Sequence, residues 1–132
     1  MFALNASFAH QALGALTLAS YVNSHSGVVC EVLECSINDR GDEIFYKLCE
    51  NAKDKKLIGF SCYIWNIEKM LKFAESLKKL MPDIYIVFGG PEVSFYEESD
   101  FCSQYKFVDF LIRGEGEEKL MRLLGELFSD SF

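Results

Sequence analysis

The stretch Ile84-Tyr85-Ile86-Val87-Phe88-Gly89-Gly90-Pro91-Glu92 decides the fold. Its β-branched and aromatic residues predict a buried strand, and the two glycines predict a strand end that another group approaches closely. Open α/β sheets bind their ligands at the carboxyl ends of their strands. A tight turn from strand to loop is the alternative explanation, so the interpretation depends on the other predicted strands.

Further predicted strands lie on both sides of this stretch, at residues 2–5, 28–33, 57–61 and 107–112. Apolar residues at helical spacing predict helices between them, over about 9–23, about 42–52, from a cap at Asn66 to Pro82, and after Glu117. The acidic and aromatic residues 93–106 predict at most a short helix. This alternation predicts an α/β fold, a flavodoxin-like (Rossmann-like) three-layer sandwich whose five-stranded parallel sheet has the order 2-1-3-4-5.

Composition narrows the range of partners. The chain has 132 residues, which suits one domain with a single core. It carries 20 acidic and 13 basic residues, for a net charge of -7, and no basic cluster stands out. We therefore expect neither nucleic acid nor a membrane as partner. The start lacks the positive region of a secretory signal, and the uncharged stretch 12–22 is too short to span a bilayer.

The number and spacing of the cysteines indicate a reducing compartment. None of the cysteines forms a Cys-x-x-Cys pair, and their number is odd. They are Cys30, Cys35, Cys49, Cys62 and Cys102. Buried, reduced thiols in a cytoplasmic protein fit this pattern.

The first predicted helix is unusual because no Asp, Glu, Lys or Arg occurs from Met1 to Cys30. A helix that is uncharged all round is usually covered on more than one side. We expect this helix to be covered by a ligand, another domain or a second subunit. The alternative is that small residues such as Ala15, Ala19 and Ser20 make a weakly polar surface.

Unusual loops follow the predicted strands. They are residues 5–10, 61–66, 89–93 and 113–117. Because the carboxyl ends of parallel strands meet at one edge of a sheet, these loops are expected to lie together. They offer hydroxyls, amides and bare glycine backbone, while Tyr63 and Trp65 offer flat apolar surface. Such a rim suits a large planar ligand with hydrogen-bonding side groups, and does not suit proton transfer or nucleophilic attack.

Several standard sites are absent from the sequence. No Gly-x-Gly-x-x-Gly follows the first strand, and there is no Gly-Lys-Ser/Thr. His10 could be a cofactor ligand or a capping residue at the start of a helix. Cys62 could be a reactive thiol or a small buried side chain. Glu115, Glu117 and Glu118 suit a helix N-terminus, so capping alone would explain them.

Segments 3–10, 58–63, 88–94 and 112–117, in this order and at these spacings, resemble one known family. It is the cobalamin-binding domain that precedes the catalytic barrel in B12-dependent radical SAM proteins, a group with many methyltransferases. The resemblance spans nearly the whole chain. It implies that a corrin ring lies against the carboxyl edge of the sheet while the nucleotide tail of the cofactor runs into the domain.

The resemblance also implies which residues touch the cofactor. Ser61, Gly89 and Gly90 would flank the tail or the corrin amides, and Tyr63 and Trp65 would pack near the ring. Gly90→Val is expected to abolish corrinoid binding and leave the fold intact. No residue is assigned as catalytic or as a metal ligand. The full set of expected cofactor-binding residues is Asn5, Ala6, Ser7, His10, Ser61, Cys62, Tyr63, Trp65, Gly89, Gly90, Pro91, Glu92, Arg113, Gly114, Glu115 and Gly116.

One departure concerns the cobalt. Cobalamin domains of the methionine synthase type carry Asp-x-His-x-x-Gly after the first strand, and the histidine ligates cobalt. Here the chain reads Asn5-Ala6-Ser7-Phe8-Ala9-His10-Gln11-Ala12-Leu13-Gly14, without the aspartate and with the glycine one place too far. His10 is therefore not assigned as cobalt ligand. Displacement of the tail base without histidine, a weaker mode of binding and loss of binding all stay open.

A second departure concerns the enzyme. The Cys-x-x-x-Cys-x-x-Cys site for a [4Fe-4S] cluster is absent, so the cluster and S-adenosylmethionine would bind only in a missing C-terminal part. Residues 1–132 are expected to be one excised N-terminal domain, not catalytic alone, that presents a corrinoid to a C-terminal radical SAM domain for methyl transfer.

Two other functions stay open. The chain could be a degenerate flavodoxin-like domain that has lost cobalamin and serves in interaction or substrate recognition. It could also be a stand-alone binding protein for another nucleotide-like ligand. In isolation, a homodimer would be one way to cover the uncharged helix.

Overall fold

The computed structural model describes residues 2–5, 13–25, 29–36, 39–62, 67–90, 96–113 and 116–128. Strands and helices alternate along these residues. They are β1 (Phe2–Asn5), α1 (Leu13–His25), β2 (Leu33–Ser36), α2 (Gly41–Ala52), β3 (Leu57–Ser61), α3 (Ile67–Leu80), β4 (Tyr85–Gly89), α4 (Glu98–Gln104), β5 (Phe110–Leu111) and α5 (Glu117–Leu127).

The strands form a sheet with the order β2-β1-β3-β4-β5. Each neighbouring pair is parallel, so the predicted α/β fold with a parallel sheet is confirmed. Ser61 at the end of β3 lies opposite Gly89 at the end of β4 on one side and Ala3 of β1 on the other. The carboxyl ends of these strands therefore meet at one edge.

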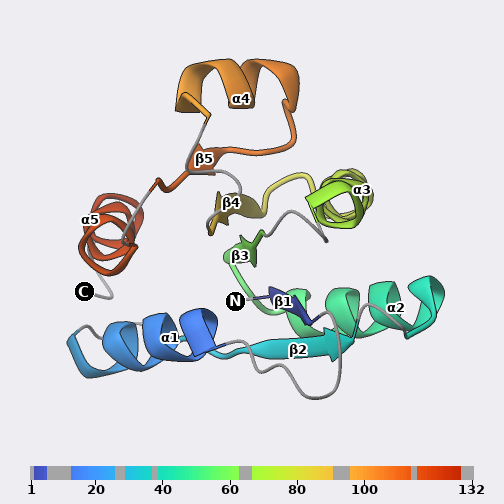
Figure 1. Ribbon diagram of the computed structural model, residues 1–132, viewed down its shortest axis with the longest axis horizontal. Helices are drawn as coiled ribbons and strands as arrows, with labels where there is room; N and C mark the ends of the chain where they lie inside the picture. Colours follow the sequence, from blue (N-terminus) through green and yellow to red (C-terminus); the bar gives the residue numbers. More distant parts are fainter. Residues whose placement is uncertain are drawn as a thin grey trace.

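Helices cover both faces of the sheet (Figure 1). In that view α1 and α5 lie on one side of the strands and α2 and α3 on the other, with α4 beside β5. A large buried cluster joins Leu48 of α2, Met70 of α3 and Phe101 of α4 to the sheet. A smaller cluster joins Val22 of α1 to Leu120 and Leu124 of α5. Burying these two apolar faces stabilises the three layers.

Alternation along the central strands gives the two faces different characters. Successive side chains of a strand point to opposite faces. Phe60 and Phe88 are fully buried in the large cluster, and their rings stack with centroids 5.1 Å apart. The alternate positions toward the carboxyl ends of β3 and β4, which face α1 and α5, are occupied by Gly59, Ser61, Val87 and Gly89, of which only Val87 has a bulky side chain. The face toward α1 and α5 therefore carries the buried Val87 beside Gly59, and only small residues, Ser61 and Gly89, at the carboxyl ends of β3 and β4.

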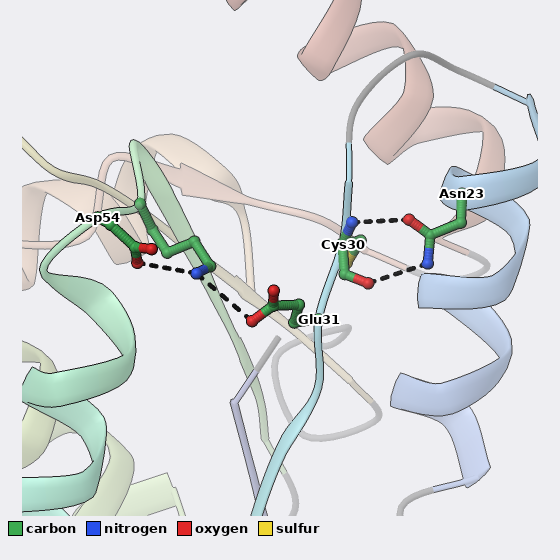
Figure 2. Close-up of polar contacts among 5 residues, drawn as sticks. Asn23, Cys30, Glu31 and Asp54 are labelled. Carbon is green, nitrogen blue, oxygen red and sulfur yellow. Dashed lines mark hydrogen bonds and ion pairs between the residues drawn. The ribbon is translucent and has the colours of Figure 1, made fainter.

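Two strand boundaries differ from the sequence expectation. β2 begins at Leu33, whereas the sequence predicted a strand over 28–33. The Asn23 side chain accepts a hydrogen bond from the Cys30 N–H at 2.7 Å and donates one to the Cys30 carbonyl at 2.9 Å, which ties Cys30 to α1 (Figure 2). β5 is confined to Phe110–Leu111 instead of 107–112. Its start is delayed because the Val108 N–H bonds the Tyr105 carbonyl in a turn.

The other elements lie close to where the apolar patterns predict them. β1 and β3 have the predicted bounds, and the expected short helix is α4. The described part of α1 packs Ala19 and Val22 inward and leaves Ser20 and Asn23 exposed. A cover for that uncharged outer side stays a prediction. No helix among the described residues is long and apolar enough to cross a membrane.

Candidate functional site

The carboxyl edge of the sheet brings together part of the predicted site. The described candidates there are Asn5, Ser61, Cys62, Gly89, Gly90, Arg113 and Gly116. The Cys62 N–H donates to the Gly89 carbonyl at 2.7 Å, which extends the pairing of β3 and β4 past their ends. Ala6, Ser7, His10, Tyr63, Trp65, Pro91, Glu92, Gly114 and Glu115 lie outside the described residues.

Gly90 is required by the backbone around it. Its φ of 109° is a conformation that residues with side chains rarely adopt. A Cβ atom at this position would lie 2.4 Å from the Cys62 carbonyl oxygen and 2.8 Å from the Cys62 nitrogen. The expectation that Gly90→Val leaves the fold intact is therefore wrong, because the valine would collide with the neighbouring chain.

Gly89 has a different environment. Among the described residues, a Cβ atom there would meet the Ile112 carbonyl oxygen at 3.7 Å and the Ile112 Cβ at 4.0 Å, which are ordinary contact distances. Packing against the described part of the chain does not demand a glycine here. Together with Gly59 and the buried Ser61, Gly89 forms a bare strip on the face toward α1 and α5. We call these three residues the bare strip.

A cavity of about 300 Å³ opens on the same face, between α1, α5 and the first half of β3. Its walls include Val22, Leu57, Leu120 and Leu124, and Gly59 of the bare strip also lines it. The cavity reaches toward the amino end of the sheet, whereas the predicted site lies at the carboxyl end. Sequence reasoning missed it because its walls come from distant helices, although the small residues at alternate positions of β3 were a signal.

Charged groups line the outer end of this cavity. The Lys55 ammonium lies 2.9 Å from the Asp54 carboxylate and 3.4 Å from that of Glu31 (Figure 2). Glu31 follows Cys30. The Asn23 side chain holds the backbone of Cys30 against the end of α1. These contacts connect α1, the approach to β2 and the approach to β3 around an apolar interior.

The thiols are placed as packing groups. Cys62 is fully buried and donates to the Phe60 carbonyl at 3.6 Å, which favours the small buried side chain over the reactive thiol. Burial raises the pKa of Cys35, of Cys49 and of Cys102, so these thiols stay protonated at neutral pH. Among the described residues, no group of three or more His, Cys, Asp or Glu side chains could hold a metal ion.

The family model of the B12 binding domain matches residues 2–124. This chain belongs to the B12-binding domain family. The resemblance drawn from the loop segments is thereby confirmed. The match includes the described strands of the sheet, α1 and α5 as far as Leu124, so the bare strip and nearly all the residues that line the cavity lie within the matched B12-binding domain.

Two curated relatives of this B12-binding domain are methyltransferases by name. One is "2-(S-pantetheinyl)-carbapenam-3-carboxylate methyltransferase" of Streptantibioticus cattleyicolor, 36% identical over 84 residues. The other is "Cobalamin-dependent radical SAM methyltransferase TokK" of Streptomyces tokunonensis, 31% identical over 84 residues. Each match covers 64% of this chain and only 12% of the relative, so the chain spans a small part of either protein.

The described residues fit a corrinoid on physical grounds. A large ligand with a flat ring and a long tail needs a sheet edge that its atoms can approach and an interior space for the tail. The bare strip leads from the carboxyl edge down the face that carries the cavity, and no bulky side chain stands at its three positions.

Proposed function

We propose that this B12-binding domain holds a corrinoid with the ring at the carboxyl edge of the sheet and the nucleotide tail on the face toward α1 and α5. The bare strip is the observation that carries this proposal. Gly89 is not demanded by packing, yet the position has no side chain, and it lies beside Ser61 in register. A ligand that needs this space accounts for the glycine.

Each described residue has a distinct part in the proposed site. Gly90 lets the chain turn against Cys62 at the end of β4 and so shapes the edge. Gly59 and Gly89 leave space for the tail, and the Ser61 hydroxyl offers it a hydrogen-bonding group. The apolar side chains of α1 and α5 exclude water from the cavity. The corrinoid itself supplies the methyl-carrying cobalt, while the protein supplies placement.

We propose further that the domain works inside a longer radical SAM methyltransferase. The support is the similarity to TokK, which is named as a cobalamin-dependent radical SAM methyltransferase. This chain matches a small part of the length of TokK. The iron–sulfur cluster and S-adenosylmethionine would be held by the rest of such a protein. The uncharged outer side of α1 is then a candidate surface for the radical SAM domain.

The proposal is tested by titrating the reduced domain with hydroxocobalamin and methylcobalamin, followed by absorbance and calorimetry. Saturable binding with the spectrum of a displaced tail base is expected. Gly89→Ala adds one methyl to the bare strip without a clash in the free protein. Overpacking a filled site costs about 1–3 kcal/mol, so its corrinoid Kd should rise roughly tenfold or more.

Gly41→Ala is the matched control, because a Cβ at Gly41 meets no atom of the described residues within 4 Å and the residue lies at the start of α2. It should bind corrinoid as the wild type does. Unchanged affinity in Gly89→Ala would contradict the placement of the tail. Corrinoid binding can be tested both in the domain and in a longer form with its radical SAM part. If neither binds, the result would support a degenerate flavodoxin-like domain that serves in interaction or substrate recognition.

A further inference from the structure

The end of β5 carries a backbone donor that the sheet does not use. The Ile112 N–H points inward and bonds the Phe88 carbonyl of β4 at 2.8 Å. Because donors alternate along a strand in a parallel ladder, the preceding Leu111 N–H points to the outer edge, where the sheet has no further strand among the described residues.

Glu98 supplies the acceptor for this donor. Its side chain, at the first turn of α4, accepts a hydrogen bond from the Leu111 N–H at 3.0 Å. Phe101 of the same helix packs in the large cluster against Phe88, with ring centroids 5.9 Å apart. Phe101 therefore anchors α4, which lies beside β5 (Figure 1), to the sheet, and Glu98 fixes the edge strand to that helix.

The residue after Leu111 forms the wall beside the bare strip. Ile112 is the residue that a Cβ at Gly89 would contact, through its carbonyl oxygen and its Cβ. On its other side, the Arg113 carbonyl accepts a hydrogen bond from the Lys119 ammonium of α5. The segment 111–113 is thus held by α4 at one end and by α5 at the other, and Ile112 lies between these two ties.

We infer that Glu98 is a positioning residue for the corrinoid site, an inference that rests on the proposed function. By holding Leu111 it sets the position of Ile112, and Ile112 sets the width of the space at Gly89. Glu98 lies in the first turn of α4 and belongs neither to the bare strip nor to the residues that line the cavity. Its effect on the cofactor passes through one backbone hydrogen bond and the adjacent residue.

The test compares Glu98→Ala with Glu98→Gln in two measurements. Amide exchange by NMR in the cofactor-free protein should be roughly tenfold faster at Leu111 in Glu98→Ala, since the acceptor is gone. The corrinoid Kd of that variant should rise roughly tenfold. Glu98→Gln keeps an oxygen acceptor at the same reach and should restore both values to within about threefold of wild type.

Glu97→Ala is the matched control, because it removes the same charge one residue earlier and the Glu97 side chain makes no capping hydrogen bond. It should leave both measurements unchanged. Wild-type exchange at Leu111, or wild-type affinity, in Glu98→Ala would overturn the inference, as would equal losses in the Ala and Gln variants. If the wild type binds no corrinoid, the proposed function fails and the inference about the site fails with it, while the exchange data still decide whether Glu98 holds Leu111.

Discussion

At the scale of residues, the adjacent glycines Gly89 and Gly90 have different surroundings. Gly90 has a positive φ and leaves no room for a Cβ against Cys62, so the fold itself demands it. Gly89 has ordinary space around it among the described residues, and under the proposed function a bound ligand would account for its lack of a side chain. The fold thus accounts for Gly90, while a binding role for Gly89 is part of the proposal.

The pair gives a direct stability prediction. Gly90→Ala should lower the free energy of unfolding by more than about 1 kcal/mol, because an alanine at positive φ is strained and its Cβ collides with backbone atoms. Gly89→Ala should change it by less than about 1 kcal/mol. Urea denaturation followed by circular dichroism measures both variants. Equal destabilisation would show that the two positions are not distinguished by their surroundings.

Cys35 predicts a dependence of stability on alkaline pH. Burial raises its pKa above the usual 9.0, so the thiol of the unfolded chain ionises first as the pH rises. Below about pH 9 both states hold the proton and stability is unaffected; above it the unfolded state is favoured and stability falls. Chemical denaturation between pH 7 and pH 10 should show a smaller decline in Cys35→Ala than in wild type. An identical decline in both proteins would exclude Cys35 as a source.

At the scale of elements, one half-buried ion pair joins α3 to the last two strands. The Asp109 carboxylate accepts hydrogen bonds from the Lys78 ammonium and the Ile86 N–H, both at 2.8 Å. The same ammonium donates to the Ile84 carbonyl at 2.6 Å. Asp109 precedes β5, so this network holds the start of β5 while Glu98 holds its end.

Breaking this network should destabilise the protein. Asp109→Ala leaves the Lys78 charge and the Ile86 N–H without their acceptor, at a cost of about 1–3 kcal/mol. Thermal or urea unfolding measures the loss. Asp83→Ala, at an exposed turn position between α3 and β4, is the control and should change stability by no more than about 0.5 kcal/mol. A loss in Asp109→Ala no larger than in the control would mean that the pair contributes little.

At the scale of the whole molecule, the sheet separates two unlike halves. The half with α2, α3 and α4 holds most of the buried core and the stacked aromatic rings. The half with α1 and α5 holds a small cluster, the bare strip and the cavity. The first half makes the domain stable, and the second leaves space that a ligand can fill.

A ligand that fills this space should stabilise the folded domain. At a free corrinoid concentration of 100 times Kd, mass action adds about 2.7 kcal/mol to the free energy of unfolding. The melting temperature should therefore rise steadily with hydroxocobalamin concentration. In Gly89→Ala the same rise should require roughly tenfold more corrinoid. A melting temperature independent of corrinoid would argue against binding by the isolated domain.

The sequence by itself determined the alternation of strands and helices, the parallel sheet and the family. These features depend on local patterns: apolar residues at helical spacing, short β-branched runs, and glycines at strand ends. The carboxyl edge was also predictable, because parallel strands place successive loops at one edge. Those patterns can be recognised without knowing how distant parts of the chain lie relative to one another.

Three features were visible only in the tertiary structure. They are the difference between Gly89 and Gly90, the start of β2 after Cys30, and the cavity between α1 and α5. Each of these depends on a contact between segments far apart in the chain. Gly90 is constrained by Cys62, and the space at Gly89 is bounded by Ile112. The Asn23 side chain forms hydrogen bonds with the backbone of Cys30. Such contacts exist only after the layers pack, so local sequence preference carries no record of them.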